Sequence, residues 1–172
     1  MNFPRELLDR AAKVRLLLSD VDGVWTDGRV TVHADGSESA DFHVQDGYGL
    51  VMLRRAGVEV AVITGRDNPA VAARVRKLGI EVLRMGSFDK GLLVEELIRE
   101  RGLLHEEVAA IGDDLPDLEM FERAGLRFAP PEGVEAVRAA ADWVTSARAG
   151  FGALREVADL LLLARGGLPS TS

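Results

Sequence analysis

Short apolar runs alternate with amphipathic segments along most of this chain of 172 residues. The runs have the length and side-chain branching of strands that are buried on both faces of a sheet. We predict strands over residues 14–18, 58–63, 80–83, 108–111, 126–129 and 143–144. We predict helices over residues 5–13, 50–55, 69–78, 90–101, 118–124, 134–140 and 154–164. Strands that alternate with helices predict an α/β fold, with a Rossmann-like parallel sheet and helices on both of its faces.

One segment, at about residues 26–45, interrupts this alternation. Two β-prone runs, 29–32 and 37–44, flank the turn signal Asp35-Gly36, so we predict an inserted β-hairpin. An exposed hairpin has free edges that invite pairing with another chain. We therefore expect the hairpin to join copies of this protein, with a simple surface flap as the alternative. Since no linker or repeat precedes a tail at about 166–172, we predict a single domain over residues 1–172.

The charge balance excludes several classes of partner. The 21 basic and 28 acidic side chains give a formal charge of −7 at pH 7, which argues against nucleic acid and against anionic membranes. Cysteine is absent, which excludes disulfides and thiolate metal sites and favours a reducing compartment. No apolar stretch is long enough to span a bilayer, and the first residues lack the apolar segment of a signal peptide. We therefore predict a cytoplasmic protein.

The first apolar run ends in two aspartates, Asp20 and Asp22, followed by Gly23. Alternation along a strand would send both carboxylates to the same side and turn Val21 into the protein. Open α/β sheets bind their ligands at the carboxyl ends of strands. Two carboxylates this close repel each other unless a cation or a hydrogen-bond donor lies between them. For this pair alone, an acidic turn after a core strand is the simpler interpretation.

Further polar side chains follow the later predicted elements in order: Thr64, Lys90, Asp113, Asp114 and Asp117. Adjacent parallel strands bring their carboxyl ends together, so these residues can converge on one crevice. Carboxylates and a main-chain carbonyl are the oxygen ligands that suit Mg²⁺, which leaves Thr64 and Lys90 as donors to a phosphoryl oxygen. A carboxylate beside such a metal can attack phosphorus as a nucleophile. A second carboxylate two residues later can protonate the leaving oxygen and then activate water.

Each of these groups has a simpler interpretation when taken alone. Thr64 could begin a loop, Lys90 could be solvated, and Asp113 could cap the following helix. A lysine at the start of a helix opposes the helix dipole, which indicates another role for it. The joint occurrence of these groups, in this order, favours one shared site.

Four motifs carry a resemblance to a known family: Asp20-Val21-Asp22-Gly23-Val24, Ile63-Thr64-Gly65-Arg66, Lys90, and Gly112-Asp113-Asp114-Leu115-Pro116-Asp117. They resemble the four motifs of the haloacid dehalogenase superfamily of phosphohydrolases, over almost the whole chain. The resemblance implies that Asp20 is the nucleophile and Asp22 the general acid/base, while Thr64 and Lys90 hold the phosphoryl group. It also implies Mg²⁺ bound by Asp20, the Asp22 carbonyl and Asp113, with support from Asp114 and Asp117.

The gaps between these motifs are too short for the cap domain that many superfamily members carry. The patterns at residues 46–49 and 150–156 resemble the cap-less family of 3-deoxy-D-manno-octulosonate 8-phosphate phosphatases. That family implies a phosphorylated sugar acid as substrate, a place in lipopolysaccharide biosynthesis, and a homotetramer that pairs its hairpins. The resemblance further implies substrate contacts by the following residues: Thr64, Gly65, Arg66, Lys90, Asp46 and Gly47.

Two positions depart from the pattern of this family. Phe151 stands where a polar or basic residue is usual, and Asp67 lies close to where an anionic substrate would bind. Both leave the phosphatase chemistry unchanged, but they keep open the phosphate of another nonulosonic acid or a broad range of small phosphate esters. Arg66 could bind a substrate carboxylate in a bidentate fork or form a structural salt bridge.

Two alternatives belong to other functional classes. A receiver domain also clusters acids, a threonine and a lysine on a parallel sheet, but it needs an aspartate at the end of its third strand. Here that strand runs into Leu83-Arg84-Met85, which disfavours a receiver domain. A non-catalytic accessory subunit would keep the fold and serve assembly. The reactive residues are all intact, so we predict a Mg²⁺-dependent phosphomonoesterase that forms a phosphorylated Asp20.

Overall fold

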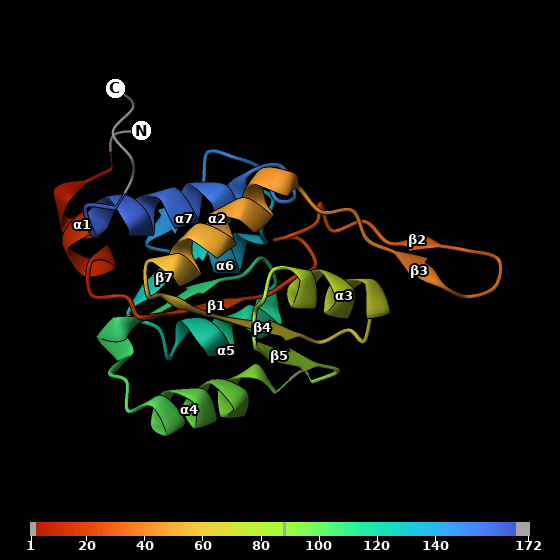
Figure 1. The fold of residues 1–172 in the computed structure, drawn as a ribbon, viewed down its shortest axis with the longest axis horizontal. Helices are drawn as coiled ribbons and strands as arrows, with labels where there is room; N and C mark the ends of the chain where they lie inside the picture. The colour runs from red at the N-terminus through yellow and green to blue at the C-terminus, as the bar shows by residue number, and fades with distance from the viewer. Residues whose placement is uncertain (1–2, 88, 168–172) are drawn as a thin grey trace.

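Six parallel strands form one sheet at the centre of the computed structural model, which describes residues 3–87 and 89–167 (Figure 1). Their order across the sheet is β5-β4-β1-β6-β7-β8. Their bounds are β1 (Leu16–Ser19), β4 (Glu59–Thr64), β5 (Val82–Met85), β6 (Val108–Ile111), β7 (Leu126–Ala129) and β8 (Trp143–Val144). Each neighbouring pair is parallel, and β1 lies between β4 and β6. The predicted α/β fold is confirmed.

Helices cover both faces of the sheet (Figure 1). They are α1 (Arg5–Ala11), α2 (Val44–Arg55), α3 (Pro69–Lys77), α4 (Lys90–Arg101), α5 (Leu118–Phe121), α6 (Glu135–Ala140) and α7 (Ala153–Ala164), with 3-10 turns at His105–Glu107 and Leu115–Asp117. Apolar residues of α1, α2, α3 and α7 share one core, and those of α4, α5 and α6 share the other. Alternate residues of β1 feed the two cores, because Leu17 faces one and Leu16 and Leu18 face the other.

Helix α2 differs from its prediction, because it begins at Val44 and not near residue 50. The predicted start lies after two glycines, Gly47 and Gly49, because glycine disfavours the interior of a helix. In the structure both lie inside the helix, where close packing explains them. A Cβ at Gly49 would press on Arg155 and Ala158 of α7. The glycines cost helix propensity, about 1 kcal/mol each, and tertiary packing offsets that cost.

Several smaller differences concern element ends: β1 begins at Leu16 and α1 ends at Ala11, each two residues inside its predicted bound. Strand β5 begins at Val82, two residues later than predicted, and α5 ends at Phe121. The bounds predicted for α4, β6, β7 and β8 agree with the structure.

The inserted hairpin is present and extends away from the sheet (Figure 1). Its strands, β2 (Thr31–Val32) and β3 (Glu38–Ser39), are antiparallel and shorter than predicted. The turn is held by the Asp35 carboxylate, which accepts hydrogen bonds from the amide and the hydroxyl of Ser37. Val32 is 64% exposed at the outer part of the hairpin.

Helix α7, the last helix of the described residues, packs beside α1, the first (Figure 1). Two glycines, Gly166 and Gly167, close helix α7 by donating their amides to carbonyls of its last turn. The rest of the predicted tail, 168–172, lies outside the described residues. Within the described ranges no helix combines the length and the apolarity needed to cross a membrane.

Candidate active site

The carboxyl ends of β1, β4 and β6 open into a cavity of about 270 Å³. The three strands are in register at this end, because Ser19 lies opposite both Val62 and Ile111. An open α/β sheet binds its ligands at such an edge. The lining residues are Asp20, Asp22, Gly28, Thr64, Gly65, Arg66, Lys90, Asp113, Asp114, Pro116 and Asp117. The structure thus brings together residues from all four motifs that the sequence singled out.

The loop after β1 sets the directions of the first two carboxylates. Strand β1 ends at Ser19, so a tight turn, and not strand alternation, orients Asp20 and Asp22. The amides of residues 24 and 25 donate to the carbonyl of Val21, whose side chain is buried as predicted. The indole of Trp25 donates to the Ser19 hydroxyl, which donates to the Asp20 carbonyl. These contacts fix the turn, and both carboxylates line the cavity.

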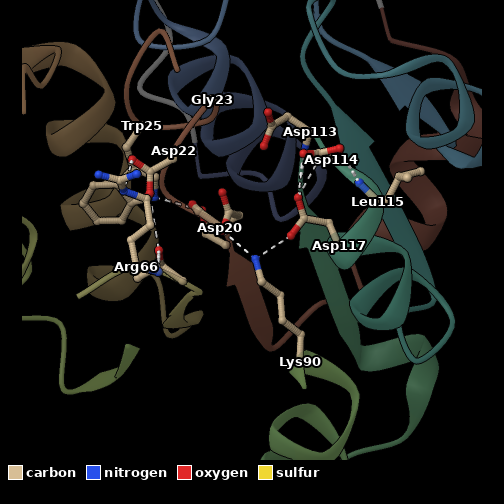
Figure 2. A network of polar contacts seen from close by, with 12 residues as sticks. Asp20, Asp22, Gly23, Trp25, Arg66, Lys90, Asp113, Asp114, Leu115 and Asp117 are labelled. Atoms are coloured by element: carbon tan, nitrogen blue, oxygen red, sulfur yellow. Dashed lines mark hydrogen bonds and ion pairs between the residues drawn. The ribbon is translucent and has the colours of Figure 1, made fainter. Parts of the chain in front are cut away.

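Lys90, the first residue of α4, lies buried between two carboxylates (Figure 2). Its Nζ donates to Asp20 Oδ1 at 2.5 Å and to Asp117 Oδ1 at 2.6 Å. Burial lowers the pKa of Lys90, but the charges of Asp20 and Asp117 outweigh this and raise it above its ordinary value. This ion pairing explains why a lysine begins a helix, where its charge opposes the dipole.

Asp117 organises the acidic turn after β6. Its Oδ2 accepts hydrogen bonds from the amides of Asp113 and Asp114, while Oδ1 accepts from Lys90. A Cβ at Gly112 would overlap the Asp117 side chain, so the glycine allows this close approach. The Asp114 carboxylate points elsewhere, since it caps the amide of Leu115. Asp117 therefore holds Lys90 and shapes the turn that presents Asp113.

The acid cluster carries more negative charge than Lys90 offsets. Burial and the charge of Asp117 raise the pKa of Asp20 well above its ordinary value, and Lys90 counters only part of this. Burial, and then the charges of Asp117 and Asp114, raise the pKa of Asp113 to about 7. One carboxylate oxygen each from Asp20, Asp113 and Asp117 lie within 4.8 Å of one another. A set of oxygen donors with excess negative charge fits a hard divalent cation such as Mg²⁺.

Thr64 and Arg66 approach the cluster from the end of β4. The Thr64 hydroxyl lies 3.4 Å from Asp22 Oδ2 and accepts the amide of Arg66 at 3.2 Å. The Arg66 Nε lies 3.7 Å from Asp22 Oδ1, and its Nη2 donates to Glu38 Oε2 of the hairpin at 2.5 Å. The hydrogen bond to Glu38 raises the pKa of Arg66. A second cavity, of about 650 Å³, adjoins this pair and is also lined by Asp67.

Asp46 and Gly47, predicted to contact substrate, do not line the cavity at the ends of β1, β4 and β6 in this chain. The buried Asp46 accepts hydrogen bonds from the amides of Gly152 and Arg155, so it ties α2 to the beginning of α7. Gly47 leaves room for the guanidinium of Arg74, which a Cβ would overlap. In a single chain the Asp-Gly-Tyr-Gly segment supports the packing of α2 and not the cavity wall.

Three residues near the site were not predicted from the sequence. Gly28 and Pro116 line the cavity, and Glu38 holds Arg66. Pro116 lies inside the acidic motif, so its spacing to Asp113 could have indicated it. Glu38 carries no such local signal, because its partner is 28 residues away.

Comparison with known proteins agrees with this geometry. A protein-family model described as haloacid dehalogenase-like hydrolase matches residues 80–154. The 3-deoxy-D-manno-octulosonate 8-phosphate phosphatase KdsC of Escherichia coli K12 is 40% identical over 163 residues, which are 95% of this chain and 87% of that protein. This chain belongs to the haloacid dehalogenase-like hydrolases.

Solved structures of similar proteins extend the comparison to three dimensions. The hypothetical protein XCC2798 of Xanthomonas campestris has a TM-score of 0.94 and 42% identity, covering 98% of this hydrolase and 92% of that chain. The Moraxella catarrhalis 3-deoxy-D-manno-octulosonate 8-phosphate phosphatase, solved with a magnesium ion, a phosphate ion and KDO, has a TM-score of 0.92 and 38% identity. The matched region covers 95% of this chain and 94% of the Moraxella chain. The hydrolase family predicted from the four motifs is confirmed.

Proposed function

We propose that this hydrolase is a Mg²⁺-dependent phosphatase that converts 3-deoxy-D-manno-octulosonate 8-phosphate to the free sugar acid and phosphate. One observation carries the chemistry: the buried Asp20 carboxylate lies in the cavity, held by Lys90 and surrounded by further acids. The relatives described above, about 40% identical over nearly the whole chain, support the choice of substrate.

In the first step we propose Asp20 as the nucleophile. A carboxylate oxygen of Asp20 attacks the phosphorus, forming an aspartyl-phosphate, while the bond from phosphorus to the ester oxygen breaks. Asp22, next to it in the cavity, gives a proton to that leaving oxygen. Lys90 and the Thr64 hydroxyl are placed to donate hydrogen bonds to non-bridging phosphoryl oxygens, where negative charge must be stabilised.

In the second step water hydrolyses the aspartyl-phosphate. Asp22, now ionised, takes a proton from the attacking water, and the bond from phosphorus to the Asp20 oxygen breaks. Phosphate leaves, Asp20 is regenerated, and Asp22 is protonated again for the next cycle. One residue thus supplies the acid of the first step and the base of the second.

The residues that would hold Mg²⁺ are Asp20, the main-chain carbonyl of Asp22, and Asp113. Asp117 supports them through the amides of Asp113 and Asp114, and Asp114 shapes the same turn. When bound there, the ion supplies positive charge that offsets the repulsion between the carboxylates and the phosphate. Gly65 and Arg66 complete the wall that faces the remainder of the substrate, and the guanidinium suits a sugar-acid carboxylate.

We further propose that the protein is a homotetramer assembled through its hairpins. The hairpin projects from the body, has two free edges and exposes Val30 and Val32 (Figure 1). A cap-less site of this kind is open to solvent, and a neighbouring subunit would exclude water from it.

The chemical test compares the wild-type protein with Asp20→Asn in the presence of Mg²⁺. Phosphate release from 3-deoxy-D-manno-octulosonate 8-phosphate should fall by roughly 10³-fold or more, the order expected when a covalent nucleophile is removed. The amide keeps the shape of the carboxylate, so circular dichroism should show an unchanged fold. Appreciable turnover by Asp20→Asn would contradict the mechanism.

A panel of phosphorylated sugar acids and simple phosphate esters tests the substrate. Selective turnover of 3-deoxy-D-manno-octulosonate 8-phosphate supports the proposal. Similar turnover of many esters, or preference for another nonulosonic acid phosphate, would keep the chemistry and replace the substrate. No Asp20-dependent release from any compound would favour a non-catalytic accessory subunit.

A further inference from the structure

The Arg66 guanidinium lies between two carboxylates that belong to different parts of the fold. Asp22 comes from the loop after β1, and Glu38 comes from strand β3 of the hairpin. Arg66 Nη2 donates to Glu38 Oε2 at 2.5 Å, whereas its Nε lies 3.7 Å from Asp22 Oδ1. The first contact is a charge-assisted hydrogen bond, and the second is too long to be one.

The Nε of Arg66 is a buried donor that has no hydrogen-bond partner among the described residues. An unsatisfied buried donor is unfavourable, so Arg66 has a driving force to move toward Asp22. Nη2 shares one edge of the guanidinium with Nε, so while Glu38 holds Nη2 that fork is not available to Asp22. The Asp22 carboxylate lines the catalytic cavity, and the Glu38 carboxylate lines the adjoining cavity. Arg66 lines both cavities.

We infer that Glu38 is a positioning residue that holds Arg66 away from Asp22 and so keeps the Asp22 carboxylate free for proton transfer. Without Glu38, the guanidinium would close the gap to Asp22 and form a fork-shaped ion pair with it. A carboxylate whose two oxygens are both held by the guanidinium has neither oxygen free to face the leaving oxygen or the attacking water. The hairpin would therefore act on catalysis within its own chain, separately from any part it has in assembly.

This inference rests on the proposed role of Asp22, and its test uses two substrates and four variants. The variants are Glu38→Ala, Glu38→Gln, Arg66→Ala and the double variant Glu38→Ala/Arg66→Ala. Asp41→Asn is the matched control, because Asp41 is an exposed acid on the same arm of the hairpin, outside the ion pairs of the described residues. The substrates are 3-deoxy-D-manno-octulosonate 8-phosphate and p-nitrophenyl phosphate, which has no carboxylate.

We expect Glu38→Ala to lower kcat about 10- to 100-fold on both substrates. General acid–base catalysis contributes roughly 10²–10⁴-fold to a rate, and the variant should lose part of that contribution. Glu38→Gln keeps a hydrogen-bond acceptor for Arg66, so its kcat should fall less than that of Glu38→Ala. The kcat of Asp41→Asn should equal that of the wild type. The decisive comparison is the double variant, which should be no slower than Arg66→Ala alone, because no guanidinium is left to occupy Asp22. If Glu38→Ala costs the same with and without Arg66, the role of Glu38 is merely structural and the inference is wrong.

A crystal structure of Glu38→Ala gives an answer that does not depend on activity. Arg66 Nε should lie within hydrogen-bond distance of Asp22. An Arg66 that stays at its present separation, or that turns into solvent, would overturn the inference. If the wild type hydrolyses p-nitrophenyl phosphate but not the sugar-acid phosphate, the proposed substrate fails while the comparison of variants still decides the role of Glu38. If it hydrolyses neither, the crystal structure decides.

Discussion

Gly23 determines how closely the acidic turn can approach the first motif. It has a φ of +79°, and a Cβ at this position would overlap the Asp113 carboxylate. Two separate constraints therefore require glycine here, one on the backbone and one on space. Gly23 thus shapes the turn and leaves room for Asp113 beside the acid pair.

Gly23→Ala should therefore lower both stability and activity. A non-glycine residue at positive φ costs roughly 1–2 kcal/mol, and the displaced Asp113 carboxylate should weaken Mg²⁺ binding. The matched control is Gly57→Ala, because Gly57 has a φ of +82° but nothing within 4 Å of its added Cβ. Urea unfolding should show similar losses for the two variants, while the Mg²⁺ concentration for half-maximal phosphate release should rise only in Gly23→Ala. An equal response of both variants would contradict a spatial role of Gly23.

Single residues of the site could be predicted to different degrees. Asp20, Lys90 and Asp113 were predicted correctly as neighbours, because each stands in a motif at the end of a strand or the start of a helix. The contacts of Glu38 could not be predicted, since they depend on how the hairpin lies over the loop after β4. Asp46 was assigned to substrate, but in this chain its carboxylate bonds two amides at the start of α7.

At the scale of the elements, hydrogen bonds through Asp142 connect helix α1 to the sheet near its β8 edge. The Asp142 carboxylate accepts hydrogen bonds from the side chain of Arg10 in α1 and from the amide and guanidinium of Arg127 in β7. Burial would raise the pKa of Asp142, but these hydrogen bonds outweigh it and lower the pKa to about 2. This side chain, from the residue before β8, links α1 with β7.

Asp142→Asn should lower the free energy of unfolding by about 1.5–3 kcal/mol near pH 6, the range for hydrogen bonds to charged groups. Because the folded-state pKa is lower than the unfolded value, the contribution of Asp142 is fully present above about pH 4. It is lost as the pH falls through about 2. Urea unfolding at several pH values should therefore show the difference between wild type and variant shrinking between pH 4 and 2. A difference that does not change over this interval would contradict the assigned ion pairs.

The local sequence pattern predicted the position of most elements correctly, but it failed for the start of α2. Helix α4 begins and ends where the apolar spacing predicted, with Asp89 as its N-cap and Gly102 after its last residue. Helix α2 begins earlier because Gly47 and Gly49 face Arg74 and α7, and a helix tolerates glycine where a neighbour packs closely. The sequence alone does not reveal which helix lies against which.

At the scale of the whole molecule, the hairpin is a feature that projects from the sheet, tied to the body by the contact of Glu38 with Arg66. Val32 of β2 and Val30 just before it are exposed on an arm that stands away from the sheet (Figure 1). An apolar, open-edged hairpin favours pairing with a second copy. The resemblance to the cap-less phosphatases implies four subunits, and this exposure together with the open cavity supports assembly through the hairpin.

The double variant Val30→Asp/Val32→Asp should convert the tetramer into smaller species without unfolding the chain, because both side chains are already solvent-exposed. Sedimentation analysis should find four times the mass of one chain for the wild type and close to one chain for the variant. Leu163→Asp, at an exposed apolar position on α7, is the control and should stay tetrameric. A hairpin variant that retains four subunits would show that another surface holds the assembly.

The sequence by itself determined the order and type of the elements and the chemistry of the site. Apolar periodicity is a local property, and residues that follow parallel strands must meet at one edge of the sheet. Only the tertiary structure decided which acids share a lysine, which glycines make room for a neighbour, and that Glu38 reaches Arg66. Such contacts join positions far apart in the chain, and their existence depends on loop geometry and side-chain reach, which no local pattern encodes.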